Sequence, residues 1–184
     1  MTDSDICQKN AVADVVSTDL RASAGDFREL MSRYPTGVCV VTSTDAGGQP
    51  HGLTCSSLSS VSDAPPTLLV CLKIGGRTLA ALQSRRRFAV NLLHSRASMA
   101  AAVFSTPIPH RFSAVRWRPS PRCELPWLDA DSLGLAECRL IGEVPAADHM
   151  VVLGEVLHVT LSGGVPLLYG MRRYAAWSAY HDSG

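Results

Sequence analysis

The chain has 184 residues, enough for one well-buried domain and too few for two domains with separate cores. Seventeen Lys and Arg against 16 Asp and Glu give a formal charge of +1, which excludes the broad basic field of a protein that binds nucleic acid or anionic membranes. Hydrophobic residues make up 46% of the chain and charged residues 18%, which predicts apolar surface buried between subunits, so we expect a homodimer.

The N-terminal segment has no clear hydrophobic period and is rich in Asp, Ser and Ala, which predicts a flexible arm over 1–24. A single domain is expected over 25–178, followed by a short tail over 179–184. Charged residues in the arm exclude a secretory signal, and no stretch is long and apolar enough to span a bilayer. We therefore expect a cytoplasmic protein with no membrane partner.

Six cysteines are spread along the chain without any CxxC spacing. In a cytoplasmic protein this distribution favours buried, reduced thiols over a disulfide framework. The histidines are also scattered, and none has ligand spacing with a cysteine, so no metal site is predicted. The cysteines are Cys7, Cys39, Cys55, Cys71, Cys123 and Cys138.

The first predicted element is a short amphipathic helix. Phe27, Leu30 and Met31 recur at helical spacing, and Asp26 before them is a suitable N-cap. Pro35 ends the helix, because the residue before a proline disfavours helical backbone angles.

A β-rich body follows this helix. A β-branched run predicts a strand over Val38–Thr42, and Asp45–Gly48 then supplies residues that tolerate positive φ, which predicts a hairpin. Many strands with few helices and no βα alternation favour a mainly β fold, an antiparallel closed or split barrel, over a doubly wound sheet. Further strands are predicted over His51–Ser56, Ser57–Ser62, Leu68–Leu72, Phe88–Leu92, Ala136–Val144 and Val151–Leu161, with short helices over Leu79–Ser84 and Ala97–Phe104.

Five prolines interrupt the segment from Ser105 to Trp127, which predicts a long loop that serves as a lid or as a connection over the barrel mouth.

Neither a GxGxxG nor a P-loop motif occurs, so phosphate binding would need another device. Gly75 and Gly76 precede Arg77 and Thr78, where backbone N–H groups, a hydroxyl and a guanidinium can converge on an anion. The same residues are equally consistent with an ordinary turn in which Thr78 caps the next helix. Arg87 follows two other arginines and lies on a solvated face or turns inward to a phosphate.

Hydroxyl side chains crowd the segment 53–62, along a predicted strand. They either face water or offer the closely spaced donors and acceptors that an isoalloxazine ring requires. His149 follows Asp148, and a single histidine in this context is more often structural than catalytic. There is no GxSxG motif, so nothing supports covalent hydrolysis.

Taken together, several separated motifs resemble one family, the flavin reductase-like, FMN-binding split-barrel proteins. Within it they resemble the small reductase components of two-component flavin-dependent monooxygenases. The resemblance runs from about Phe27 to Trp177 and implies a six-stranded antiparallel split barrel with Greek-key connections, a homodimer, and flavin in a groove near the subunit interface. The motifs are Tyr34-Pro35-Thr36-Gly37-Val38, Leu53-Thr54-Cys55-Ser56-Ser57, Ser60-Val61-Ser62, Pro65-Pro66, Arg77-Thr78, Arg87-Phe88-Ala89-Val90-Asn91, Asp148-His149 and Gly154-Glu155-Val156.

The resemblance also implies the roles of individual residues. The residues expected to line the flavin ring and ribityl chain are Pro35, Thr36, Gly37, Val38, Thr42, Thr54, Ser56, Ser57, Ser62 and Tyr174. Those expected at the phosphate end are Arg77, Thr78, Arg87, Phe88 and Ala89. His149 is expected over the nicotinamide as the catalytic-site residue. Two departures stand out, since Cys55 replaces the commoner Ala and Gly75-Gly76 replaces the more usual polar residues.

The implied activity is hydride transfer from NADH, or NADPH, to N5 of FMN or FAD, with reduced flavin supplied to a separate monooxygenase. In that reaction the protein contributes position and electrostatics. Two alternatives stay open at this stage: a flavin-binding or storage protein without turnover, and a flavin oxidase of the pyridoxamine phosphate oxidase type.

Overall fold

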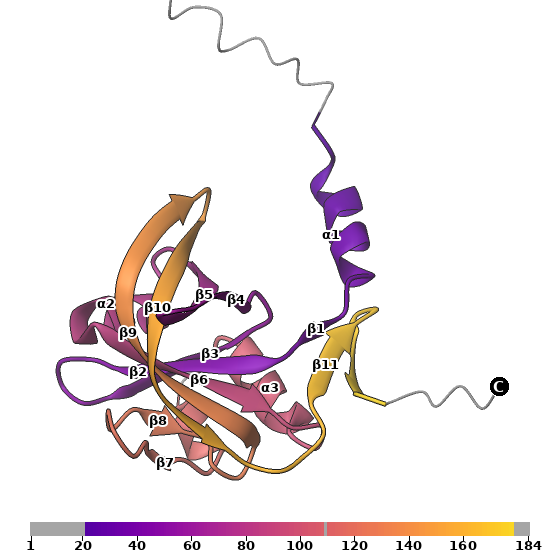
Figure 1. The fold of residues 1–184 in the computed structure, drawn as a ribbon. Helices are drawn as coiled ribbons and strands as arrows, with labels where there is room; N and C mark the ends of the chain where they lie inside the picture. Colours follow the sequence, from indigo (N-terminus) through magenta and orange to yellow (C-terminus); the bar gives the residue numbers. More distant parts are fainter. Residues whose placement is uncertain (1–20, 109, 179–184) are drawn as a thin grey trace, which may run out of the picture. The chain divides into compact units, whose positions relative to one another are not determined.

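Figure 1 shows the computed structural model, which describes residues 21–108 and 110–178. Most of the expected arm, the expected tail and Cys7 lie outside these residues. The chain divides after Tyr34 into two compact units, the second beginning at Pro35. No helix among the described residues is long and apolar enough to cross a membrane.

The first unit contains helix α1 (Ala24–Ser32). Its N-cap is Ser23 rather than the expected Asp26, because the Ser23 hydroxyl accepts the Asp26 N–H at 3.0 Å and also donates to the Asp26 carboxylate at 2.7 Å. Asp26 therefore lies in the first turn, where a negative charge favours the helix N-terminus.

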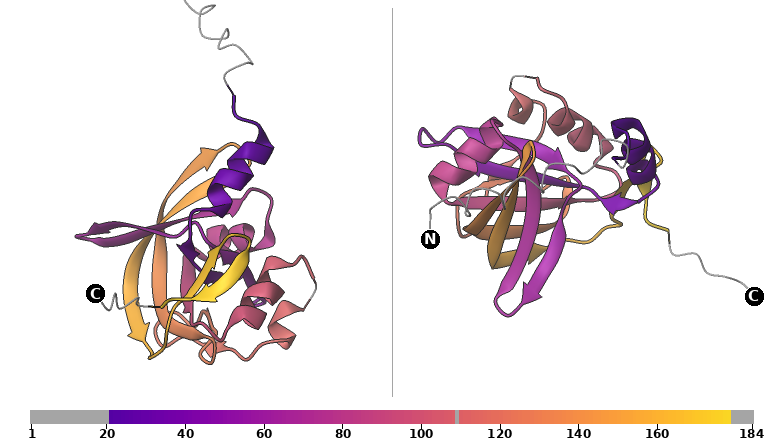
Figure 2. Two further views of the ribbon diagram at one scale, coloured as in Figure 1. Left: turned by 90° about the vertical axis from the view of Figure 1, so that its right-hand side faces the viewer. Right: turned by 90° about the horizontal axis from the view of Figure 1, so that it is seen from above.

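The second unit is built on one antiparallel seven-stranded sheet, in the order β3-β2-β6-β9-β10-β5-β4. The sheet has seven strands rather than the six that the resemblance implies, because Ser59–Asp63 joins it as an edge strand beside β5. The strands are β2 (Cys39–Thr44), β3 (Pro50–Cys55), β4 (Ser59–Asp63), β5 (Pro66–Lys73), β6 (Arg87–Leu93), β9 (Ser132–Ala146) and β10 (His149–Leu161). The long β9–β10 hairpin bends around the shorter strands, and Figure 2 shows this bend from two further directions.

Shorter elements complete the second unit. Two small sheets accompany the main one: β1 (Thr36–Gly37) with β11 (Leu167–Gly170) and β12 (Arg173–Ala176), and β7 (Arg118–Pro119) with β8 (Pro126–Trp127). The helices are α2 (Arg77–Arg85), α3 (Ser98–Ser105) and the 3-10 turn η2 (Arg111–Ser113). The mainly β, split-barrel class predicted from the sequence is thus confirmed.

Strand β2 is buried on both faces, which explains its run of apolar residues. Cys39 and Val41 join the core that β5, β6, β9 and β10 share with α2, whereas Val40 joins a second core under α3. The predicted hairpin after β2 is confirmed, since the Gly48 N–H donates to the Asp45 carbonyl and Gly48 has a φ of +77°.

The barrel is open between β3 and β5, which approach each other without strand pairing. The predicted strand Ser57–Ser62 begins later, at Ser59, because Ser57 leaves the sheet and bonds to β5 through its side chain. The Ser57 hydroxyl accepts the Cys71 N–H at 2.9 Å and lies 3.3 Å from the Cys71 carbonyl. A single side chain therefore bridges the gap where backbone pairing stops.

The proline-rich segment is held by two buried polar residues, Glu137, which belongs to no motif quoted above, and Asn91, the last residue of the Arg87–Asn91 motif. The Glu137 carboxylate accepts the Ser120 hydroxyl and the N–H groups of Arg122 and Cys123. Asn91 accepts the Leu128 N–H at 2.9 Å. These bonds satisfy backbone groups that have no strand partner, so the irregular segment can be buried.

Candidate functional site

Two adjoining cavities open at the gap between β3 and β5. The first, here called the split cavity, has a volume of about 470 Å³ and runs along the residues from Leu53 to Ser57, facing Cys71 of β5. The second, the cationic cavity, has a volume of about 730 Å³ and lies against the start of α2 and the segment after α3. Both are lined by Leu53, Lys73, Pro107 and Arg111, so they form one continuous groove.

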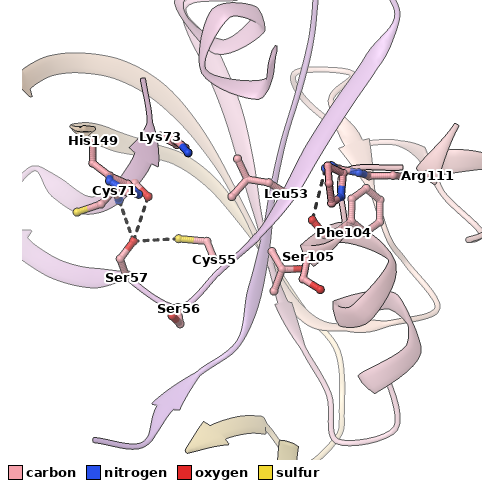
Figure 3. Close-up of a pocket in the computed structure, with 12 residues that line it drawn as sticks. Leu53, Cys55, Ser56, Ser57, Cys71, Lys73, Phe104, Ser105, Arg111 and His149 are labelled. Atoms are coloured by element: carbon pink, nitrogen blue, oxygen red, sulfur yellow. Dashed lines mark hydrogen bonds between the residues drawn. The ribbon is translucent and has the colours of Figure 1, made fainter. Parts of the chain in front are cut away.

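Hydroxyls, thiols and backbone groups line one side of the split cavity. In Figure 3, Ser57 lies between Cys55 and Cys71, with His149 on the same side, and Arg111 lies with Phe104 on the other side of Leu53. The Cys55 thiol is 3.1 Å from the Ser57 hydroxyl. This wall offers donors and acceptors without a fixed carboxylate charge, which suits a polar, uncharged heterocycle.

Three cations, Lys73, Arg77 and Arg111, line the cationic cavity. None of the three has a carboxylate within 4.0 Å among the described residues. Burial, and after it the charge of Arg77, lowers the pKa of Arg111 from its ordinary value. Like charges gathered without counter-ions favour a bound anion, with phosphate the group that guanidinium geometry fits best.

Arg111 is held rigidly at the junction of the two cavities. Its Nη1 atom donates to the Gly52 carbonyl at 2.8 Å and to the Phe104 carbonyl at 3.4 Å. Its Nε atom is buried and has no hydrogen-bond partner among the described residues. The guanidinium is therefore fixed in place with donor capacity left over for a ligand.

The carboxylate beside these cations, Asp45, is already occupied. It contacts His51 at 2.9 Å and accepts the N–H groups of Gly47 and Gln49. The hydrogen bond from His51, followed by that from Gln49, holds the pKa of Asp45 below its ordinary value. Asp45 therefore forms no ion pair with Lys73, Arg77 or Arg111 among the described residues.

His149 lies at the rim of the split cavity, where β10 begins opposite Lys73. Its Nδ1 atom is 2.8 Å from the Asp148 carboxylate. The hydrogen bond from His149 also holds the pKa of Asp148 below its ordinary value. The exposed carboxylate thus orients the ring while its other edge stays free to contact a molecule in the cavity.

Comparison with known proteins identifies the family. Residues 31–178 match the model of the flavin reductase like domain. This chain belongs to the flavin reductase-like family. It is 49% identical over 156 residues to a flavin reductase (NADPH) of Lentzea aerocolonigenes. The matched residues make up 85% of this chain and 91% of that protein. It is 42% identical to a flavin reductase (NADH) of Kitasatospora aureofaciens, covering 85% and 83%.

A solved structure carries ligands of the expected kind. The Streptomyces globisporus NADH:FAD oxidoreductase SgcE6, in complex with NAD and FAD fragments, superimposes with a TM-score of 0.78 and is 27% identical, covering 87% of this chain and 94% of that one. The resemblance predicted from separated sequence motifs is confirmed by these comparisons.

In this flavin reductase-like protein, six of the residues expected at the flavin lie in the groove. Thr54, Ser56, Ser57 and His149 line the split cavity, and Arg77 and Thr78 line the cationic cavity. Thr78 is buried but does not cap α2, whose N-cap is Gly76. The expected contacts of these six with flavin stay predictions.

A second group of the expected residues lies outside both cavities. Thr36 and Gly37 pair with β11, and Tyr174 of β12 packs on Tyr169 at 5.3 Å between ring centroids, so the family's Pro35-Thr36-Gly37 motif belongs to the small three-stranded sheet. Ser62 accepts the Ala64 N–H on the edge strand, and Arg87 is exposed at the start of β6.

Four further expected residues have buried side chains. Thr42, Phe88 and Ala89 are 0% exposed and Val38 is 4% exposed, so their side chains face the interior. The reason is the position of β2 and β6 in the middle of the sheet, covered on both faces. The Thr42 hydroxyl, for example, donates to the Pro126 carbonyl at 2.6 Å. Their expected contacts with flavin stay predictions.

The sequence missed Lys73 and Arg111, the two cations at the junction. Lys73 follows the predicted strand Leu68–Leu72 and Arg111 lies in the predicted proline-rich loop, and neither belongs to a motif quoted above. The expectation that this loop covers the barrel mouth was the only available signal, and Pro107 and Arg111 do line the groove.

Proposed function

We propose that this chain is an NAD(P)H:flavin oxidoreductase that supplies reduced FMN or FAD to a separate monooxygenase. The observation that carries the proposal is the continuous groove, in which a wall of hydroxyls, thiols and backbone groups adjoins three cations that have no carboxylate within 4.0 Å among the described residues. A flavin nucleotide has the matching division into a polar ring system and an anionic phosphate end. The relatives' names and the match to the family model support the same activity.

The residues present fit a flavin in one orientation. The ring would lie in the split cavity against Thr54, Ser56 and Ser57, and the phosphate would lie in the cationic cavity against Arg77 and Thr78. When bound, flavin supplies the N5 atom that accepts a hydride from nicotinamide. The chain's own residues bind and orient the two reactants, since hydride transfer needs no protein acid or base.

Holding two reactants together in the groove is the main catalytic contribution we assign to the protein. Close positioning of this kind lowers an activation barrier by several kcal/mol, about the lower part of the range for oriented reactants.

Steady-state oxidation of NADH and NADPH with excess FMN, FAD or riboflavin tests the proposal. We expect many turnovers per protein with at least one flavin nucleotide. Oxidation of no more than one equivalent would instead indicate a storage protein, and flavin retained through gel filtration with oxidation of a phosphorylated amine would indicate an oxidase. The same matrix decides between the two nicotinamides and between the two flavin nucleotides.

Replacing His149 with alanine is expected to raise the KM for NADH roughly three- to tenfold, the equivalent of one lost hydrogen bond, with little change in the Kd for flavin. The reason is that the His149 imidazole lies at the rim of the split cavity, beyond the hydroxyl groups that would contact flavin. A matched control is His158→Ala, on the same strand and outside both cavities. Loss of flavin affinity with an unchanged KM for NADH would contradict this role.

We also infer that the chain is a homodimer, supported by an apolar stripe on β10. Val159 and Leu161 alternate beyond a bulge at Leu157 and are 50% and 78% exposed, so they share one uncovered face, and Leu157 beside them is 43% exposed. A contiguous apolar face of this kind is typical of subunit contacts.

The free thiols of the five described cysteines support the cytoplasmic location inferred from the sequence.

Replacing Val159 with aspartate is expected to weaken the dimer about a thousandfold, because a two-fold contact would bury two unpaired carboxylates. Sedimentation velocity over a concentration series measures the change. Met99→Asp is the control, since Met99 is an exposed apolar residue on α3, apart from the stripe. A variant with wild-type mass at all concentrations would place the subunit contact elsewhere.

A further inference from the structure

Three cysteines from three strands meet beside the split cavity. Cys39 of β2 is directly opposite Cys55 of β3 in the strand register, and Cys71 lies on β5 across the gap. The Cys39 thiol is 3.3 Å from the Cys55 carbonyl oxygen, and the Cys55 thiol is 3.1 Å from the Ser57 hydroxyl. Cys55 and Cys71 both line the cavity, whereas Cys39 lies behind them in the core, so a small molecule in the groove meets Cys55 before Cys39.

The surroundings of Cys55 favour its thiolate form. The hydrogen bond with the Cys39 thiol has the largest effect and, with bonds from the Ser57 hydroxyl and from backbone N–H groups of Ser57 and Cys71, it lowers the pKa of Cys55 to about 6 in spite of burial. The pKa of Cys39 is raised, first by its hydrogen bond to Cys55, so it stays a thiol. Burial likewise raises the pKa of Cys123 and Cys138. A thiolate beside a protonated thiol is the arrangement of an attacking and a resolving cysteine.

The positions of Cys39 and Cys55 also permit a bond between them. Residues directly opposite in an antiparallel pair have Cα atoms about 4.5–5.5 Å apart, within the range that a disulfide spans. Both side chains belong to the same core cluster and therefore point to the same face of the sheet.

We propose that Cys55 and Cys39 form a peroxide-sensitive thiol pair that weakens flavin binding when it is oxidised. The Cys55 thiolate attacks hydrogen peroxide, the O–O bond breaks, and Cys55 becomes a sulfenic acid with release of hydroxide. The Cys39 thiol then attacks the sulfenic sulfur, forming the disulfide and releasing water. Two thiols lose two electrons, and one peroxide is reduced to two waters.

The source of the peroxide rests on the proposed function. Reduced flavin that meets dioxygen instead of a partner enzyme returns to oxidised flavin, and the dioxygen becomes hydrogen peroxide. Oxidation of Cys55 then removes the sulfur contact of Ser57, the side chain that bridges β3 and β5. This change alters the wall against which the flavin ring would lie. Flavin reduction therefore slows when reduced flavin reacts with dioxygen instead of reaching a partner enzyme.

The first test is peptide mapping by mass spectrometry, and it needs no flavin. The full chain is treated with hydrogen peroxide, free thiols are alkylated, and the digest is mapped. We expect a loss of two hydrogens located on the Cys39 and Cys55 peptides, reversed by a thiol reductant. In Cys39→Ala we expect a dimedone adduct on Cys55 and no disulfide, whereas Cys138→Ala, the control, forms the disulfide normally. If both thiols can still be alkylated after the wild-type protein is treated with peroxide, the proposed thiol pair is wrong.

A second measurement tests the regulatory consequence. With the disulfide formed, we expect the Kd for FMN to rise roughly three- to tenfold, the equivalent of one lost hydrogen bond, and to recover on reduction. An unchanged Kd in the fully oxidised protein would overturn the regulatory role. If the chain does not reduce flavin at all, the mapping experiment still decides the thiol pair, so the two failures are distinguishable.

Discussion

Replacing Arg77 with alanine is expected to raise the Kd for FMN roughly 10- to 150-fold while leaving riboflavin binding unchanged. A hydrogen bond to a charged group contributes about 1.5–3 kcal/mol, which corresponds to that range. Arg77 is exposed at the first turn of α2 and makes no ion pair in the described structure, so its loss removes phosphate contacts without disturbing the core. Equilibrium titration of both flavins measures the difference.

The control for this change lies on the same helix. Arg85 is an exposed arginine in the last turn of α2 and lines neither the split nor the cationic cavity, so Arg85→Ala is expected to leave both Kd values unchanged. Added salt should weaken FMN binding to the wild-type protein, because it screens the attraction between Arg77 and the phosphate. The effect of salt on the Arg77 variant should be smaller, because that variant lacks this charge. Equal losses of FMN and riboflavin affinity would contradict a phosphate site at Arg77.

Replacing Gly154 with alanine is expected to destabilise the protein by about 3 kcal/mol or more, at the upper end for overpacked cores. A Cβ atom at Gly154 would lie 2.4 Å from Phe88 Cζ and 3.1 Å from Cys138 Cβ. Phe88 is 0% exposed in the main core, so its ring has no space into which to move. At this size, such a loss lowers Tm by roughly 6–12 °C, which thermal unfolding measures.

Gly163→Ala provides the comparison, since a Cβ there meets nothing within 4 Å and its φ requires no glycine. It is expected to change Tm little. A Gly154 variant as stable as this control would show that the β9–β10 hairpin can move away from Phe88, and the tight packing inferred at this point would be wrong.

Local patterns in the sequence were enough to predict most of the strands and their turns. The apolar run of β2 and the glycine-rich turn after Asp45 specify a hairpin because the side-chain period and the positive-φ requirement act within a few residues. The same reasoning placed α2 and α3 to within a few residues. It failed at Ser57, where a hydroxyl bonded to the distant Cys71 backbone ends the strand that the residue types favour.

The candidate site could be predicted only in part. Thr54, Ser57 and Arg77 were expected at the flavin from the resemblance, and they do line the groove. Phe88 and Thr42 were expected there too, although their side chains point into the core, because a motif does not tell which face of a central strand is open. Arg111 could not be predicted, since its carbonyl anchors at Gly52 and Phe104 come from two other segments.

By itself, the sequence determined the fold class, because this depends on residue types at short and regular spacings, and the family, through the resemblance that several separated motifs carry. Only the tertiary structure decided which hydroxyls face a cavity, that Lys73, Arg77 and Arg111 line one cavity, and that Cys39 lies opposite Cys55. The physical reason is that strand register and the break between β3 and β5 join residues far apart along the chain. Contacts of that kind follow from packing of the whole sheet.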